Sequence, residues 1–427
     1  MFDNNVLEAI RNVRKAATRL SLLSDSERCS ILERGAAALL ERSSEIIEAN
    51  RIDLEESRKK GISEAILHRI ALGQEKLEST VDAMRAVMAL PCPIGRVKER
   101  RLLDEGLLLE KVTYPLGVIG MVFEARPDAM IQIISLALKS GNGIVLKGGS
   151  EARNTNEAIA RVLRESLDGA EWMLLLSTHS DVDMMMKAEK DIDLMIPRGS
   201  NAFVRHVMES THIPVLGHAD GICAVYIDDE ADLEKAVTIA TDAKVQYPAA
   251  CNAAETILVS RKIAKDFLPA FKASLDRYGV IIHGDRETAE HIECIPATEE
   301  DFDTEYLALE LAIKVVGSID EAIEHIGNHS SHHTDAIVTE NREKILRFFR
   351  EVDSADVFAN ASTRFADGFR FGLGAEVGIS TSKIHARGPV GLEGLTTTKW
   401  QLSGSGQIVA SYSGKGARRF LHKELEI

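Results

Sequence analysis

The stretch that decides the fold reads Val245-Gln-Tyr-Pro-Ala-Ala-Cys251-Asn-Ala-Ala-Glu-Thr-Ile-Leu-Val259. One cysteine lies in an elbow of small residues, directly before an apolar run that is typical of a β-strand. A thiolate is a strong nucleophile and a good leaving group, so a cysteine on a turn can attack an acyl carbon and later release it. Most intracellular cysteines are buried fillers instead, but the small residues around Cys251 leave room for a ligand. We therefore expect Cys251 to be the nucleophile, with Asn252 as a polar neighbour.

The composition is that of an ordinary globular protein. At about 150 residues per domain, 427 residues suggest two or three domains. A net charge of −15 argues against nonspecific binding to nucleic acid or to an anionic membrane. No apolar run approaches the roughly 20 residues that cross a bilayer, and the start lacks the regions of a signal peptide. The five cysteines are widely spaced, which indicates neither a disulfide framework nor a zinc site, so we expect reduced thiols and a cytoplasmic protein.

The first part of the chain predicts helices followed by a β-hairpin. Ser24 and Glu27 form a capping box ahead of apolar residues at helical spacing, and the break at Pro91-Cys-Pro93 ends this helical block. Residues 96–103 and 107–113 are two strand-like runs about the turn Asp104-Glu-Gly106. The strand-like tail, at residues 396–402 and 407–411, is expected to pair with this hairpin.

From Pro115 onward, short apolar runs alternate with helical segments, a pattern that predicts parallel sheets with crossover helices. Before Cys251 the expected strands are 117–123, 143–147, 194–197 and 224–227, with helices at 129–139 and 155–166. After it they are 255–259, 280–282, 311–316 and 334–338. The fold class is therefore α/β.

Two segments indicate a dinucleotide site, although the chain has no G-x-G-x-x-G motif. Lys147-Gly-Gly-Ser-Glu-Ala follows one strand, at the end where α/β sheets bind ligands. Pro197-Arg-Gly199-Ser200-Asn201 follows another strand and precedes a helix, whose free N–H groups can hold a phosphate. Each segment alone is weak, because a glycine turn before a helix is usually only a turn. Their order relative to Cys251 strengthens the interpretation.

Several motifs carry a family resemblance, and two of them share the Cys251 elbow. Pro115-Leu-Gly-Val-Ile-Gly120, Lys139-Ser-Gly-Asn-Gly-Ile-Val-Leu-Lys147, Ile196-Pro-Arg-Gly-Ser-Asn201 and the Cys251 elbow occur in the order expected of the aldehyde dehydrogenase superfamily. The other five are Ala250-Cys-Asn-Ala253, Ser331-His-His-Thr-Asp-Ala-Ile337, Asn360-Ala-Ser-Thr-Arg-Phe-Ala-Asp-Gly368, Phe371-Gly-Leu-Gly-Ala-Glu-Val-Gly-Ile-Ser380 and His385-Ala-Arg-Gly-Pro-Val-Gly-Leu-Glu-Gly-Leu395. These five resemble the gamma-glutamyl phosphate reductases, or glutamate-5-semialdehyde dehydrogenases, and the resemblance as a whole spans nearly the entire chain.

The resemblance implies NADPH-dependent reduction of L-glutamyl 5-phosphate to L-glutamate 5-semialdehyde with release of phosphate, the second step of proline biosynthesis. It implies a Rossmann-like cofactor domain at residues 1–95 and 115–243, and a catalytic α/β domain at 244–394. Residues 96–114 and 395–427 are then a small β oligomerisation domain. The expected partners are the small-molecule substrate, further copies of the chain, and glutamate 5-kinase in a transient complex.

The resemblance also assigns site residues. By position, Lys147, Gly199 and Ser200 match cofactor contacts, and Glu305 matches the carboxylate that meets the nicotinamide ribose. Arg126 falls where related dehydrogenases place the asparagine that supports the oxyanion, so the chain departs from the wider pattern there.

The preference for NADPH over NADH and the groups that hold the oxyanion are each predicted from only one or two residues. NAD-preferring relatives often carry a glutamate three residues after the lysine, whereas Ser150 stands at that spacing here, which permits the 2′-phosphate of NADPH. Glu151 is adjacent, so this is only an indication. Backbone N–H groups near Cys251, with Asn252 or Arg126, are expected to hold the oxyanion. For Arg126 the alternative is a salt bridge between domains.

Two further features complete the expected chemistry. Dehydrogenases that release a free acid commonly carry a glutamate base in a Glu-Leu-Gly-Gly segment, whereas the matching stretch here, Val215-Leu-Gly-His-Ala-Asp-Gly-Ile-Cys223, has none. Losing that base suits an enzyme that must keep water from a thioester. The polar loops near the C-terminal end suit the amino and carboxylate groups of glutamate. Their candidate residues are Asn360, Ser362, Thr363, Arg364 and Arg387.

Three alternatives stay open. The histidines 325, 329, 332 and 333 lack an acidic or cysteine partner, so we expect a polar helix end and loop rather than a metal site. A cysteine acyltransferase or hydrolase needs a histidine base, and none lies beside Cys251 in the sequence. A catalytically silent scaffold tolerates a broken elbow or cofactor loop, and neither is broken.

Overall fold

The computed structural model describes residues 2–217 and 220–427. Contacts within the chain divide it into two compact units. Unit 1 comprises Met1–Gly199, His206–Val215 and Val390–Ile427, and unit 2 comprises Ser200–Arg205 and Leu216–Pro389. No helix in the described part of the chain is long and apolar enough to cross a membrane.

Five helices open unit 1, where the sequence predicts a helical block. The capping box of α2 is present: the Ser24 side chain accepts from the Glu27 backbone N–H, and the Glu27 side chain accepts from Ser24 N. Such reciprocal bonds satisfy N–H groups that have no partner within the helix. The five helices are α1 (Phe2–Leu20), α2 (Asp25–Glu41), α3 (Ser43–Lys59), α4 (Glu64–Ile70) and α5 (Gln74–Ala89).

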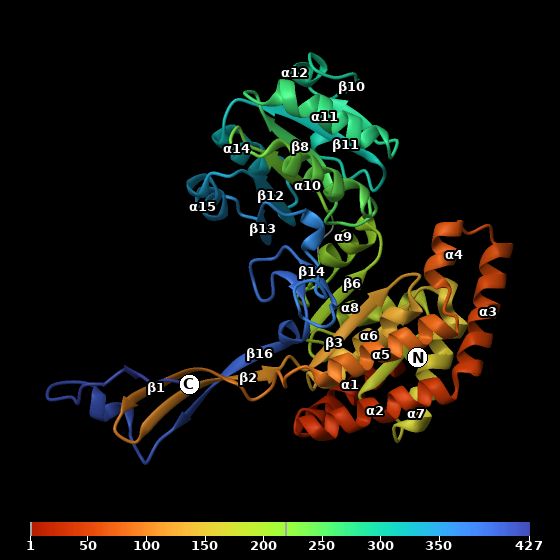
Figure 1. Ribbon diagram of the computed structural model, residues 1–427. Helices are drawn as coiled ribbons and strands as arrows, with labels where there is room; N and C mark the ends of the chain where they lie inside the picture. The colour runs from red at the N-terminus through yellow and green to blue at the C-terminus, as the bar shows by residue number, and fades with distance from the viewer. Residues whose placement is uncertain (1, 218–219) are drawn as a thin grey trace. The chain divides into compact units, whose positions relative to one another are not determined.

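A four-stranded parallel sheet, in the order β5-β4-β3-β6, forms the core of unit 1. Figure 1 labels two of its strands, β3 and β6. Connections between parallel strands of one sheet are right-handed. The chain passes from β3 to β4 and then to β5 through α6 and α7, so these two helices share one face of the sheet. It then runs back from β5 to β6 through α8, which therefore lies on the opposite face. The reversal falls between β3 and β6, and open α/β sheets bind ligands beyond such a point. The elements are β3 (Val118–Phe123), α6 (Pro127–Lys139), β4 (Gly143–Gly148), α7 (Arg153–Ser166), β5 (Met173–Leu176), α8 (His179–Lys187) and β6 (Leu194–Arg198).

The hairpin and the tail form a second sheet of unit 1, in the order β16-β2-β1-β17. The predicted pairing of the tail with the hairpin is confirmed for β16, which runs antiparallel to β2 over eight residue pairs. The strand predicted at residues 407–411 is wrong, because a 3-10 turn, Val409–Tyr412, lies there. The strands are β1 (Val97–Asp104), β2 (Leu107–Pro115), β16 (Thr396–Ser403) and β17 (Lys423–Glu424).

Unit 2 is built on a seven-stranded parallel sheet, in the order β10-β9-β11-β8-β7-β12-β13. Successive residues of β7 point to opposite faces of the sheet. Val225 packs in an apolar cluster with α10 (Leu233–Val245) and α11 (Ala264–Asp276). Tyr226 packs in a second cluster with α14 (Ile319–His329) and α15 (Arg342–Glu351). Such continuous burial on both faces is typical of parallel sheets. The strands are β7 (Cys223–Ile227), β8 (Ala254–Ser260), β9 (Ile281–Gly284), β10 (Ile295–Pro296), β11 (Glu310–Val316), β12 (Thr334–Val338) and β13 (Asp356–Ala359).

Helices and short strands complete unit 2. They are α10 (Leu233–Val245), α11 (Ala264–Asp276), α12 (Arg286–Ala289), α13 (Glu299–Phe302), α14 (Ile319–His329) and α15 (Arg342–Glu351), with a two-stranded sheet of β14 (Gly378–Ser380) and β15 (Gly388–Val390).

The boundary between the units lies earlier in the chain than the expected one after residue 243. Residues 216–243 belong to unit 2 because β7 pairs with β8 and β12. α9 (Asn201–Ser210) crosses the boundary, with its first five residues in unit 2. Strand pairing, which the periodicity of one segment does not reveal, decides the division.

Candidate active site

Cys251 lies in a turn between α10 and β8, as the sequence predicts. Pro248 follows the end of α10 and cannot donate a helical hydrogen bond, so the chain turns there. The turn is closed by the backbone bonds Ala250 N to Tyr247 O, at 3.2 Å, and Ala253 N to Ala250 O, at 2.8 Å. The thiol is free and partly exposed, as a nucleophile must be.

Two neighbours hold the elbow in place. The Cys223 thiol, which is fully buried on β7, donates to the backbone oxygen of Cys251 at 3.3 Å. Asn252 is 3% exposed, and its amide Nδ2 donates to the backbone oxygen of Ala366 at 2.7 Å. In this arrangement the Asn252 N–H group serves the main chain, so an oxyanion role for Asn252 stays a prediction.

A buried ion pair joins the two elements that flank the elbow. Lys244, in the last turn of α10, donates to Glu255, the second residue of β8, and neither side chain is exposed to solvent. Burial raises the pKa of Glu255 to about 8 and lowers the pKa of Lys244, although the partners oppose these shifts. Perturbed groups of this kind often mark functional sites. Sequence reasoning missed the pair, although Glu255 lies in the elbow stretch, because only the packing of α10 against β8 brings Lys244 to it.

Glu305 lies beside the elbow, on the loop between α13 and β11. A β-carbon added at Gly221 would stand 2.3 Å from Cys251 O and 2.6 Å from Glu305 Oε1, so only glycine fits between them. Asn201 Nδ2 donates to Glu305 Oε2 at 2.5 Å and so holds the carboxylate. The structure thus brings Cys251 and Glu305 together within unit 2. Asn201 and Gly221 are additions to the predicted site, although Asn201 directly follows the predicted Gly199-Ser200 turn.

The predicted cofactor residues of unit 1 lie at the carboxyl ends of its sheet. Lys147, the last residue but one of β4, is 4% exposed, and burial lowers its pKa against the opposing effect of Glu151 and Asp181. The Glu151 carboxylate accepts from the backbone N–H of Ala125. Ser150 opens a 3-10 turn directly after the strand. A buried lysine on a strand end suits a sugar or phosphate group of a dinucleotide.

The switch point between β3 and β6 carries two more predicted residues. Arg126 follows β3 and precedes α6, and Gly199 follows β6. The backbone bond from Glu124 N to Arg198 O, at 3.0 Å, joins the two strand ends. Ser200 then precedes α9, so the predicted strand, turn and helix start are present. Arg126 belongs to unit 1 and Cys251 to unit 2; its role at the oxyanion stays a prediction.

Two of the predicted substrate residues are hydrogen bonded to other residues of unit 2. Asn360 has a left-handed backbone, with φ of 53°, and its side chain bonds both N and O of Thr339. Arg387 donates to the backbone oxygen of Asp353 at 2.9 Å and to its carboxylate at 3.2 Å.

The segment from Ser362 to Arg364 lies against the elbow instead. Ser362 Oγ accepts from Arg364 N, and Arg364 Nε donates to Gln246 Oε1 at 2.9 Å. Thr363 Oγ1 is buried and has no hydrogen-bond partner in the described part of the chain. Of the predicted substrate residues, Arg364 is therefore the one that the structure brings to the residues just before Cys251.

Other polar clusters have structural explanations. Lys344 forms ion pairs with three neighbouring carboxylates, so a lysine and not a metal ion balances their negative charge in this structure. The three are Asp228, Asp229 and Glu230. His325 was expected at a polar helix end, but it is 5% exposed and packs edge-on against Phe302, and burial lowers its pKa to about 3.

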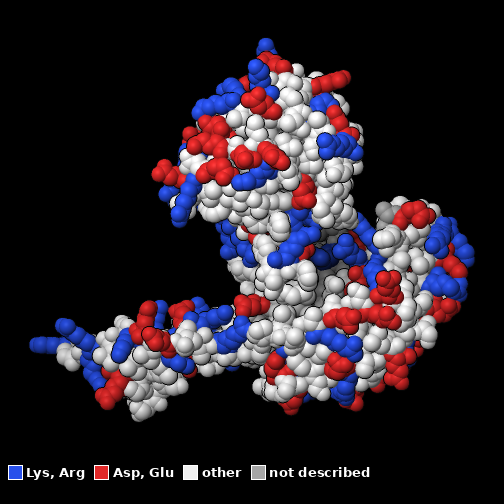
Figure 2. Space-filling view, in the orientation of Figure 1, with Lys and Arg blue, Asp and Glu red and all other residues white. Residues whose placement is uncertain are grey.

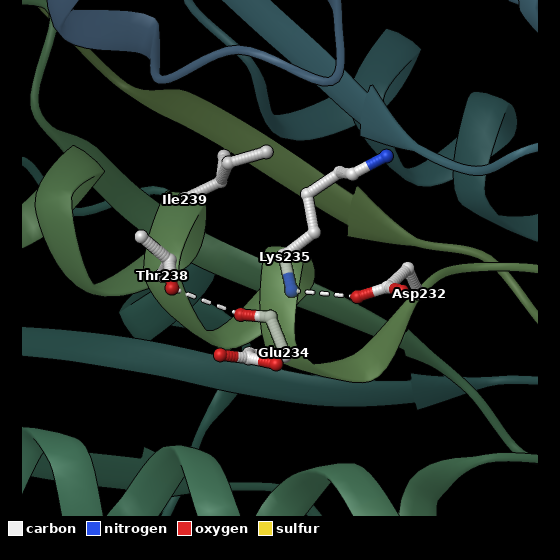
Figure 3. Close-up of a pocket in the computed structure, with 5 residues that line it drawn as sticks. All are labelled: Asp232, Glu234, Lys235, Thr238 and Ile239. Carbon is white, nitrogen blue, oxygen red and sulfur yellow. Dashed lines mark hydrogen bonds between the residues drawn. The ribbon is translucent and has the colours of Figure 1, made fainter.

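A surface depression at the start of α10 is lined by Asp232, Glu234, Lys235, Thr238 and Ile239 (Figure 3). Asp232 accepts from Lys235 N, and Thr238 Oγ1 donates to Glu234 O, so its polar groups serve the helix. Figure 2 shows acidic and basic side chains interspersed over the face in view.

Comparison with known proteins decides the family. The model of the aldehyde dehydrogenase family matches residues 3–290. The chain belongs to the aldehyde dehydrogenase family. The predicted α/β fold with parallel sheets is thereby confirmed.

Relatives narrow the resemblance. The chain is 48% identical over 425 residues to the gamma-glutamyl phosphate reductase of Acetivibrio thermocellus, covering 99% of this chain and 98% of that one. It is 50% identical over 418 residues to that of Ruminiclostridium cellulolyticum, covering 97% and 96%. The crystal structure of gamma-glutamyl phosphate reductase from Thermotoga maritima matches with a TM-score of 0.93 at 41% identity, covering 94% of this chain and 99% of that one. The resemblance inferred from the motifs is confirmed.

Proposed function

We propose that this chain reduces L-glutamyl 5-phosphate to L-glutamate 5-semialdehyde with NADPH and releases phosphate, the second step of proline biosynthesis. The partly exposed Cys251, held in a turn between α10 and β8, carries the proposal. Relatives called gamma-glutamyl phosphate reductase, similar over nearly the full length, support the choice of substrate.

The chemistry follows from the thiolate. Cys251 Sγ attacks the acyl carbon, the carbon–oxygen bond to phosphate breaks, and a glutamyl thioester remains on the protein. NADPH, when bound, supplies the hydride that reduces this thioester. The thiohemiacetal oxyanion then collapses, the aldehyde leaves, and the thiolate is restored. Backbone N–H groups at the elbow, with Asn252 or Arg126, stabilise the oxyanion, a role worth about 3–4 kcal/mol per donor in other enzymes.

Water must stay away from the thioester while it waits for hydride. The stretch from Val215 to Cys223 holds no glutamate to act as a base; residues 218 and 219 of it lie outside the described residues. Glu305, which lies near the elbow, is hydrogen bonded to Asn201 instead. A thioester in this site therefore persists until it is reduced, or until phosphate attacks it in the reverse direction.

The remaining residue assignments are proposals of the same kind. Lys147, Ser150, Gly199, Ser200 and Glu305 contact NADPH. A buried lysine on β4, a turn before α9 and a carboxylate beside the elbow fit a dinucleotide in residue type. Asn360, Ser362, Thr363 and Arg387 contribute to the pocket for the glutamyl group.

Assembly and location are also proposed. The hairpin and tail, residues 96–114 and 395–427, form an oligomerisation domain of a homo-oligomer, because β16 is an edge strand with exposed Trp400 and Leu402. Light scattering of the Trp400→Lys variant against wild type tests this. The protein acts in the cytoplasm, and a transient complex with glutamate 5-kinase shelters the labile acyl phosphate.

The decisive experiment runs the reaction in reverse. The enzyme is mixed with L-glutamate 5-semialdehyde, phosphate and NADP⁺, and the nicotinamide absorbance is followed with phosphate present or omitted. Phosphate-dependent reduction of NADP⁺ is the expected result. No signal with either nicotinamide cofactor would favour an acyltransferase, a hydrolase or a silent scaffold.

A further inference from the structure

Arg364 is a buried cation without a carboxylate partner. It is 9% exposed, and Gln246 is the acceptor for its Nε. In the described part of the chain it forms no ion pair; Asp242 and Asp367 act on it only electrostatically, and burial lowers its pKa. Burying a guanidinium without an anion is costly. An anion that binds there removes the cost.

A second arginine adds to the positive charge. Arg370 Nη1 donates to the backbone oxygen of Arg364 at 2.6 Å. Repulsion from the charge of Arg370 adds to burial in lowering the pKa of Arg364. Arg370 also forms no ion pair among the described residues, and it is exposed. Two neighbouring cations of this kind suit a dianion better than a single negative charge.

The segment that carries Arg364 is attached to the elbow on both sides of Cys251. Before the nucleophile, Arg364 bonds Gln246 and lies 5.9 Å from the centre of the Tyr247 ring. After it, Asn252 Nδ2 bonds Ala366 O at 2.7 Å. Arg364 is also close enough to Cys251 for the two charges to interact. These attachments hold the arginine beside the elbow that carries Cys251.

We infer that Arg364, assisted by Arg370, binds the phosphoryl group of the acyl phosphate and holds the departing phosphate. The inference deepens the proposed function and rests on it. As the bond between sulfur and the acyl carbon forms, the carbon–oxygen bond breaks, and its electron pair stays on the phosphate oxygen. The guanidinium stabilises that charge, and a proton from water completes hydrogen phosphate. In reverse, the same site delivers inorganic phosphate to the thioester.

The test varies phosphate and semialdehyde separately in the reverse reaction. The Arg364→Gln variant should raise the KM for phosphate at least about 30-fold, since it removes charge-assisted hydrogen bonds, and leave the KM for semialdehyde within about twofold. Arg364→Lys should recover part of the loss, because a lysine keeps the charge without the planar fork. Arg370→Gln should raise the KM for phosphate by about fivefold. Arg261→Gln, which changes a surface arginine paired with Glu287, is the matched control and should leave both constants unchanged.

The outcomes separate the alternatives. If the KM for semialdehyde rises while that for phosphate is unchanged, Arg364 binds the carboxylate of the substrate and the inference is overturned. If Arg364→Gln does not fold, as judged by thermal unfolding, Arg364→Lys and Arg370→Gln decide: an unchanged KM for phosphate in both overturns it. A wild type without phosphate-dependent activity contradicts the proposed function itself.

Discussion

The two units bury their cations in different ways. In unit 1, Lys139 is fully buried and donates to Asp25 at 2.9 Å, to Met88 O at 3.1 Å and to Cys29 Sγ at 3.3 Å. In unit 2, the fully buried Lys244 has only Glu255, whose second oxygen has no partner among the described residues. The buried Arg364 has no carboxylate partner at all in that part of the chain. Lys139 thus has several hydrogen-bond acceptors, whereas Lys244 and Arg364, on the segments next to Cys251, have few, which is common at functional sites.

The largest effect expected from this comparison is at the nucleophile. Cys251→Ser should lower phosphate-dependent semialdehyde oxidation by at least about 10⁴-fold, because a serine hydroxyl is not ionised at neutral pH. Nicotinamide absorbance measures the rate. Thermal unfolding should be unchanged, since the elbow keeps its backbone bonds. Residual turnover above about 0.01% of wild type would contradict the prediction, and Cys251→Ala, which has no side-chain nucleophile, should be at least as slow.

The ion pair tests the contrast directly. Lys244→Met should destabilise the protein by about 3–5 kcal/mol, because it leaves the buried carboxyl group of Glu255 without its hydrogen-bond donor, and the added Glu255→Leu should restore most of that loss. We expect the double variant to stay slow, because the pair aligns the elbow. Urea unfolding and kcat are the measurements. Lys139→Met in unit 1 should cost about 1–2 kcal/mol without changing kcat, because the partly exposed Asp25 can be solvated. If the Lys244→Met, Glu255→Leu double variant keeps the wild-type kcat, the Lys244–Glu255 pair affects stability alone, as Lys139 is expected to do, and the prediction is wrong.

The contact at Gly221 sharpens the comparison further. In Gly221→Ala, the new β-carbon collides with the Cys251 main chain, and a displacement of about 1 Å at the nucleophile can lower kcat about 100-fold. Gly327→Ala is the control in the same unit: it lies within α14 with open space around it and should stabilise by about 1 kcal/mol at unchanged kcat. If Gly221→Ala and Gly327→Ala have the same kcat, the close contact between Gly221 and the Cys251 main chain does not matter for turnover, and the prediction is wrong.

Asp356 extends the contrast to pH. Burial raises its pKa to about 6, above the value of about 3.9 for an unfolded chain. Its contribution to stability is therefore full below about pH 4 and is lost as pH rises to about 6. Asp356→Asn cannot ionise and so lacks this loss. Between pH 4 and pH 7, the unfolding free energy of the variant should therefore rise by about 1–3 kcal/mol relative to that of wild type. Urea unfolding of both proteins across this range is the measurement, and a constant difference would refute the prediction.

The smallest effect belongs to unit 1. Ser24→Ala removes the capping box of α2 and should destabilise by about 1 kcal/mol, because one helix N–H loses its partner. Turnover should not change, since this contact serves stability alone. Chemical denaturation and the nicotinamide assay measure the two quantities; a fall in kcat would show that satisfied contacts of unit 1 also tune the chemistry.

Much of the fold could be predicted because it follows from neighbours in the sequence. The capping box at Ser24, the hairpin about Gly106 and the elbow at Cys251 depend on residues a few positions apart. The wrong strand at 407–411 shows the limit: a short apolar run fits a strand and a 3-10 turn equally well, and pairing decides between them.

The sequence by itself determined the alternation of strands and helices, the elbow that carries Cys251 and the family motifs, because periodicity and turns are local. Only the tertiary structure decided that 216–243 joins unit 2, that Asn201 holds Glu305 across 104 positions, and that Arg364 reaches Gln246 across 118. Such contacts depend on how sheets and loops pack, and a residue's own neighbours in the chain carry no record of that. Burial, which sets the pKa of Glu255 and the unpaired state of Arg364, is likewise a property of the packed structure.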